Sequence, residues 1–257
     1  MSQTRSTTGR LAGEGLALTL VLGAVVAWWL TSAIDAEMSA DMTGMEGMAG
    51  DSMITMSLGA FLLAWALMMA AMMLPAVTPV VRLYQRAAAA GRVAPTGYFV
   101  LAYVAVWAVT GLPAYLLWRA MAGPLTEGET WALRLAGATL LIAGTYQLTP
   151  VKRACLRHCR SPMSYFMRLQ GSLARPGGAF RAGVLHAAYC CGCCVGLMVV
   201  LVAVAAMNLW WALLIAVGVF VERNIRWGAG FALVLGAVFL ALGTAVVVSP
   251  PVLSELM

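Results

Sequence analysis

The run LGAFLLAWALMMAAMMLPAVTPV occupies residues 58–80 and holds 23 residues without a single charged side chain. An α-helix rises about 1.5 Å per residue, so roughly 20 residues cross the ~30 Å hydrocarbon core of a bilayer. In lipid every backbone N–H and C=O group must be hydrogen-bonded inside the protein, and a helix achieves this within one segment. This run therefore predicts a membrane-spanning helix.

The rest of the chain repeats this pattern. Hydrophobic residues make up 62% of the 257 residues and charged residues 10%, whereas about a quarter of the residues in soluble domains are charged. We expect one all-α membrane domain over residues 1–257 with seven transmembrane helices. It would contain a signal-anchor span within residues 1–34, an acidic outer loop at 35–56 and a helix bundle at 57–248. The other predicted spans are Leu16–Ile34, Tyr98–Met121, Trp131–Leu148, Leu185–Met207, Leu209–Val221 and Trp227–Val248.

The distribution of charge predicts the orientation of the bundle. With the N-terminus in the cytoplasm and the C-terminus outside, 14 of the 16 basic residues lie inside and eight of the ten acidic residues outside. Seven of the basic residues fall in one inner loop at 151–182. This asymmetry follows the positive-inside rule, so we expect a multi-pass protein of the bacterial cytoplasmic (inner) membrane. The net charge of +6 is then a topology signal, and the expected partner is the lipid bilayer and not nucleic acid.

All six cysteines and both histidines lie between residues 155 and 194. They form two groups, at 155–159 and at 186–194. On a helix, the histidine and cysteines of 186–194 fall within an arc of about 100°, except Cys191. Thiolates and imidazoles bind copper(I), zinc or iron–sulfur clusters, and the CCGCC spacing fits no familiar cluster-binding run. The alternative is that these residues are small apolar side chains and interfacial caps. The candidate metal ligands are Cys155, His158, Cys159, His186, Cys190, Cys193 and Cys194.

Methionines gather in two places. Four share one side of the span at 58–80 at helical spacing. Five others lie with five acidic residues at 35–53, within the loop at 35–56. Thioethers are neutral ligands that suit copper(I), and carboxylates attract cations. The alternatives are ordinary packing in the span and a solvated, flexible segment in the loop. The candidate ligands in the span are Met68, Met69, Met72 and Met73.

Two polar groups interrupt the apolar runs. Glu222 lies at the end of the shortest predicted span, and we expect Arg223 or Arg226 to be its partner. The segment Tyr-Gln-Leu-Thr-Pro at 146–150 closes another span, where proline ends or kinks a helix. We interpret both groups as structural.

The chain contains four motifs: WALMMAAMMLPA (65–76), YQLTPVKRACLRHCRSP (146–162), HAAYCCGCCVGLM (186–198) and MNLWW…ER (207–223). Together they resemble a bacterial family of predicted metal-binding integral membrane proteins of unknown function. The resemblance covers roughly residues 58–248 and implies a metal-linked role for the candidate cysteines, His186 and the four methionines. The last motif ends Glu222-Arg223 where Glu-Lys is usual in the family, and Val195 stands where tryptophan is usual.

We therefore expect a protein of copper handling, acquisition or delivery. The outer loop would concentrate the ion, the methionines would hold copper(I) inside the bundle, and the cysteines and histidines would bind it at the inner face. Zinc is the alternative metal, and a membrane protein or copper carrier is the expected partner. A copper-dependent membrane oxidase or its subunit, a thiol–disulfide redox protein and a structural zinc site stay open as alternatives. No phosphate-binding loop, dinucleotide fingerprint or nucleophile elbow occurs, and no catalytic residue is assigned.

Overall fold

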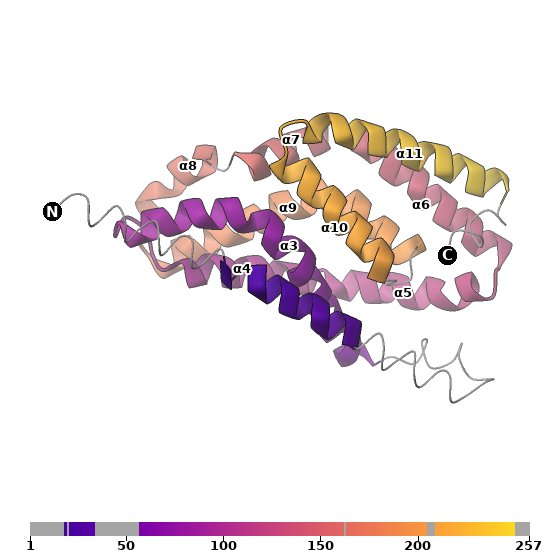
Figure 1. Cartoon of the computed structure of the whole chain (residues 1–257), viewed down its shortest axis with the longest axis horizontal. Coiled ribbons are helices and arrows are strands. Elements are labelled where there is room, and N and C mark those ends of the chain that lie inside the picture. Colours follow the sequence, from indigo (N-terminus) through magenta and orange to yellow (C-terminus); the bar gives the residue numbers. More distant parts are fainter. Residues whose placement is uncertain (1–17, 20, 34–56, 162, 205–208, 250–257) are drawn as a thin grey trace.

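The computed structural model describes residues 18–19, 21–33, 57–161, 163–204 and 209–249, and the regular elements there are helices (Figure 1). This confirms the all-α prediction. The predicted outer loop at 35–56 lies outside the described residues. A short apolar helix, Val21–Ala33, precedes the others. The later helices are α3 (Leu58–Ala89), α4 (Thr96–Val109), α5 (Gly111–Thr126), α6 (Thr130–Leu148), α7 (Pro150–Arg160), α8 (Met163–Leu173), α9 (Pro176–Val204), α10 (Leu209–Asn224) and α11 (Gly228–Val248).

The described part of the chain has four helices long and apolar enough to cross a membrane, not the seven predicted. Helix α10 has 16 residues and rises only about 24 Å, short of the hydrocarbon thickness. Helix α6 has 19 residues, but Arg134, Tyr146 and Gln147 lower its hydropathy. The first predicted span is described only as the short helix Val21–Ala33. The four candidate spans, which make this a multi-pass membrane protein by length and composition, are Leu58–Ala89, Thr96–Met121, Pro176–Ala203 and Gly228–Val248.

Helix α9 is the central helix of the bundle. It packs against α4, α5, α6, α7, α8 and α10, and its small side chains Ala179, Ala182 and Ala187 are fully buried. Small residues let helix backbones approach closely, which is how helices associate in membranes. Side chains that α9 directs inward are therefore shielded on several sides.

The segment predicted as a basic inner loop at 151–182 folds as helices α7 and α8 and the beginning of α9. Helix α7 begins where the Thr149 hydroxyl accepts a hydrogen bond from the Lys152 backbone N–H at 3.3 Å, with Pro150 in its first turn. Because α7 is a helix, Cys155 and Cys159 lie one turn apart on the same face.

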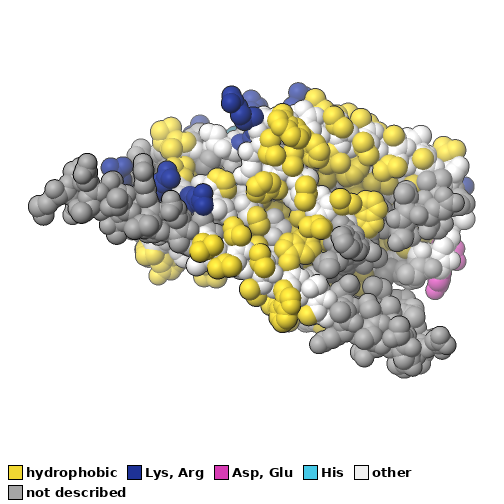
Figure 2. All heavy atoms as spheres, in the orientation of Figure 1, with side chains coloured by type: hydrophobic (Ala, Val, Ile, Leu, Met, Phe, Trp, Pro, Cys, Tyr) yellow, Lys and Arg dark blue, Asp and Glu magenta, His cyan; other side chains and the backbone are white. Residues whose placement is uncertain are grey.

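The surface separates into chemically distinct regions. Figure 2 shows hydrophobic side chains over much of the visible face, basic side chains gathered toward one end and acidic side chains at the other end. The turn between α5 and α6 carries the exposed Glu127 and Glu129. Large apolar side chains such as Leu116 and Ile142 are each 68% exposed, as expected for a lipid-facing surface.

Helices α6 and α11 pack closely through glycines. A Cβ atom added at Gly144 would lie 2.9 Å from the Gly236 carbonyl oxygen, and one at Gly243 would lie 2.9 Å from the Gly137 carbonyl oxygen. Real Cβ atoms do not approach oxygen this closely, so the two backbones are in contact only because side chains are missing there.

We expect Gly144→Ala to lower the free energy of unfolding by about 1–3 kcal/mol, because the added methyl group overpacks the interface. The matched control is Gly230→Ala on α11, where an added Cβ meets nothing within 4 Å. Alanine forms helices better than glycine by about 1 kcal/mol, so the control should be neutral or stabilising. Thermal unfolding in detergent measures both variants, and equal midpoints would contradict the close packing of α6 on α11.

Candidate metal centre

Three cysteine side chains of α9 meet at one point inside the bundle. The Sγ atoms of Cys190, Cys193 and Cys194 lie within 4.8 Å of one another, and each residue is at most 1% exposed. Their spacing of three and four residues places them on one side of the helix, as predicted from the sequence. Two metal–sulfur bonds of about 2.3 Å span up to about 4.6 Å, so only a small adjustment of these side chains is needed for the thiols to share one ion.

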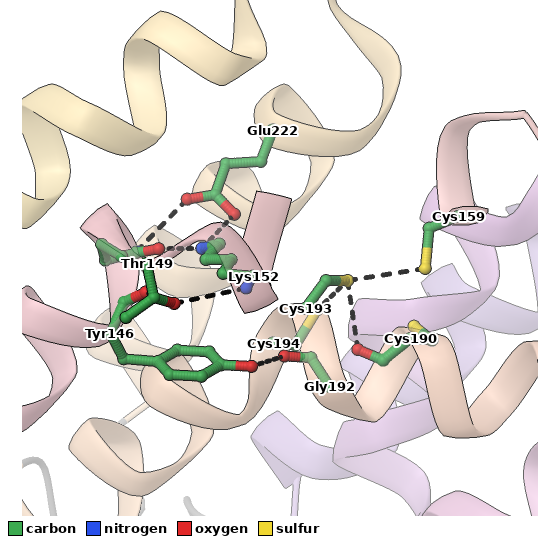
Figure 3. A network of polar contacts seen from close by, with 10 residues as sticks. Tyr146, Thr149, Lys152, Cys159, Cys190, Gly192, Cys193, Cys194 and Glu222 are labelled. Atoms are coloured by element: carbon green, nitrogen blue, oxygen red, sulfur yellow. Dashed lines mark hydrogen bonds and ion pairs between the residues drawn. The ribbon is translucent and has the colours of Figure 1, made fainter. Parts of the chain in front are cut away.

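Helix α7 adds a fourth thiol. The Cys159 Sγ atom lies 3.6 Å from that of Cys193, which is itself 3.4 Å from that of Cys194 (Figure 3). All of these residues are free thiols. Hydrogen bonding with Cys190 and Cys193, together with burial, holds the pKa of the Cys159 thiol well above its usual value. We call Cys159, Cys190, Cys193 and Cys194 the thiol cluster.

Cys155 lies at the edge of the thiol cluster. It is half-buried, and burial raises the pKa of its thiol. A Cβ atom added at Gly192 would lie 2.9 Å from the Cys155 sulfur, so α7 and α9 approach closely here. The Tyr146 hydroxyl donates a hydrogen bond to the Gly192 carbonyl and ties α6 to the same turn of α9 (Figure 3). Cys155 is thus a more accessible thiol beside the buried cluster.

The two histidines lie in different surroundings. His186 is fully buried one turn before Cys190, and its Nε2 atom lies 3.3 Å from an Nη atom of Arg223. The ring of His158 stacks on Tyr189, and its Nδ1 atom is hydrogen-bonded to the Ala154 carbonyl at 2.9 Å. His186 therefore lies beside the cluster, whereas His158 packs on the α9 surface.

Two site residues were missed in the sequence interpretation. Arg223 of α10 donates a hydrogen bond to the Cys190 Sγ atom at 2.8 Å, and the Tyr103 hydroxyl of α4 lies 3.2 Å from the same sulfur. The motif that ends in Glu222-Arg223 was a signal for the arginine. Tyr103 lies within a long apolar run, and no local pattern distinguished it.

The predicted partners of Glu222 were wrong. Its carboxylate forms an ion pair with the Lys152 ammonium at 2.7 Å, and both side chains are 2% exposed. Gln147 donates to the same carboxylate at 3.3 Å and accepts a hydrogen bond from Lys152. Arg223 is turned toward Cys190, and Arg226 is exposed. Lys152 is the only lysine among 16 basic residues, a signal that the sequence interpretation passed over.

The four candidate methionines are buried on α3. They belong to the same apolar core as the cysteines, but α3 packs on α4, α5 and α10. A site that joins these thioethers to the thiol cluster stays a prediction. The residues Met68, Met69, Met72 and Met73 are at most 2% exposed.

Comparison with known protein families identifies the family to which this chain belongs. A family model described as PpoB2, copper chaperone, matches residues 62–246, which is more than half of the chain. Helices α3 to α11 and the thiol cluster lie within the matched region, except for the ends of α3 and α11. No curated protein and no solved structure matches the chain.

We expect Lys152→Met to lower the free energy of unfolding by about 3–5 kcal/mol, because it leaves the Glu222 carboxylate buried without its counter-charge. The double variant Lys152→Met with Glu222→Met should recover much of this loss, since no charge is then buried. Arg153→Met, at the neighbouring exposed position, is the matched control and should have little effect. Thermal unfolding measures these variants together with Glu222→Met alone, and a double variant as unstable as the sum of the two single variants would contradict the pairing.

Proposed function

Since the chain belongs to the PpoB2 copper chaperone family, we propose that it binds copper(I) at the thiol cluster and passes the ion to a partner protein. The observation that carries the proposal is the convergence of three buried α9 thiols within 4.8 Å, inside the region matched by the family. The partner is a membrane protein or a soluble copper carrier, and the site lies in the bacterial cytoplasmic membrane.

The chemistry of the donors supports copper(I). Thiolates are soft ligands that select copper(I), and a buried site of low polarity stabilises an ion of low charge better than a divalent ion. Burial also keeps water and oxidants away from the thiols, which must stay reduced to bind the metal. Cys155, which is less buried, takes the ion from the cluster and passes it to the partner.

The remaining candidate ligands have separate roles in this proposal. His186 and the α3 methionines Met68, Met69, Met72 and Met73 are further ligands that copper meets inside the bundle. The acidic, methionine-rich segment at 35–56 concentrates the ion before it enters.

A structural zinc site is the second candidate. Four thiols from α7 and α9 match the ligand number of closed zinc sites, which hold two elements together. Copper and zinc make different predictions for metal content, so the same measurement separates them.

We expect the purified wild-type protein, loaded with copper(I) under reducing conditions, to retain copper through gel filtration. Replacing Cys190, Cys193 and Cys194 together with serine should reduce the retained copper to background, because serine hydroxyls do not bind copper(I) well. Elemental analysis of both proteins gives the metal content.

The matched control is Cys191→Ser, which removes a thiol of the same helix that lies outside the three-cysteine group. It should retain copper as the wild type does. Equal copper in the triple variant and the wild type would contradict the proposal. Retention of zinc in preference to copper would favour the structural zinc site.

A further inference from the structure

The side chain of Arg223 contacts two of the proposed metal ligands, Cys190 and His186. Its Nη1 atom is 2.8 Å from the Cys190 sulfur and its Nη2 atom is 3.3 Å from His186 Nε2. Nη1 is also 3.4 Å from the Tyr103 hydroxyl. Arginine only donates hydrogen bonds, so His186 Nε2 must be the acceptor, and its lone pair is the one a metal would use. Arg223 thus lies where a metal bound to Cys190 and His186 would lie.

The guanidinium is also a buried positive charge. Arg223 is 5% exposed and stays protonated in proteins. The neighbouring carboxylate does not neutralise it, because Glu222 is paired with Lys152 at 2.7 Å. The sulfur of Cys190 is the nearest group to Arg223 that can carry negative charge. The contact between Arg223 and Cys190 therefore places the guanidinium cation beside the proposed metal ligands of α9.

We infer that Arg223 competes with copper(I) for Cys190 and His186 and so determines how readily the ion is released. This inference rests on the proposed copper site. When copper binds, the Cys190 sulfur coordinates the ion as a thiolate: a copper–sulfur bond forms, the N–H···S hydrogen bond from Arg223 breaks, and any proton on the sulfur is released to solvent, with no change of oxidation state. When the ion leaves, the guanidinium returns to the same atoms.

Two features of Arg223 suit this exchange. Its buried Nε–H group has no hydrogen-bond partner among the residues that the structure describes, so the arginine is incompletely satisfied there. Copper and the guanidinium are both positive, so they repel each other at a shared ligand. A chaperone must give up its ion, and an internal cation that replaces copper lowers the cost of release.

The test is the copper(I) affinity of the full-length protein at one fixed pH, measured by competition with bathocuproine disulfonate. We expect Arg223→Gln to bind copper at least about tenfold more tightly and to release it more slowly, because a charge-assisted hydrogen bond no longer opposes binding. The matched control is Arg226→Gln, which removes an exposed positive charge near the same end of α10 and should match the wild type.

A second variant guards against misfolding of the first. Arg223→Lys keeps the charge, but its single ammonium cannot replace the two-pronged contact with Cys190 and His186. It should fold and bind copper more tightly than the wild type, though less tightly than Arg223→Gln. X-ray absorption spectra of the copper-loaded proteins should show the same sulfur and nitrogen ligands in the wild type and in Arg223→Gln. Tighter binding with an unchanged ligand set is the effect of losing a competitor, which a purely structural role of Arg223 would not produce.

The outcomes separate the two proposals. If no protein in the series binds copper, the proposed function fails. If the wild type binds copper but both Arg223 variants bind it equally or more weakly, the competition is wrong and Arg223 instead stabilises the bound ion.

Discussion

An apolar interior does not tolerate an unpaired charge, and this constraint organises the part of the bundle where α10 ends. A buried ion costs several kcal/mol unless a partner and hydrogen bonds compensate it. Helix α10 places two opposite charges, Glu222 and Arg223, at adjacent buried positions. Neighbouring residues of a helix point about 100° apart, so two different elements must neutralise them. Glu222 is paired with Lys152 of α7, and Arg223 contacts Cys190 of α9.

The thiol cluster depends on this arrangement. Lys152 lies in the first turn of α7 and Cys159 in its last turn. The ion pair with Glu222 therefore fixes the beginning of this short helix, and Cys159 lies at its end. Arg160 adds a second contact between α7 and the end of α10, because it donates a hydrogen bond to the carbonyl of Ile225, the residue that follows α10. These contacts keep Cys159 against Cys193, although α7 lies outside the long apolar helices.

The charge pairs and the thiols together suit a protein that holds a metal ion only for a time. A rigid, buried set of thiols binds a soft ion strongly, and such a site gives the ion up slowly unless something replaces it. In our proposal Arg223, which contacts the Cys190 sulfur, is that replacement, and the half-buried Cys155 passes the ion outward. Membership of the PpoB2 copper chaperone family agrees with a role in delivery more than in permanent storage.

The sequence by itself determined the membrane character, the helices and the shared side of Cys190, Cys193 and Cys194, because these follow from composition and from helical periodicity. It overestimated the number of spans among the residues that the structure describes, because it kept Leu209–Val221, already the shortest predicted span, and the more polar α6 as full spans. Only the tertiary structure decided which charges pair. Glu222 and Lys152 are 70 residues apart, and a pair of that kind depends on how helices pack and not on any local pattern. The same packing turned Arg223 away from its neighbour in sequence and onto the sulfur of Cys190.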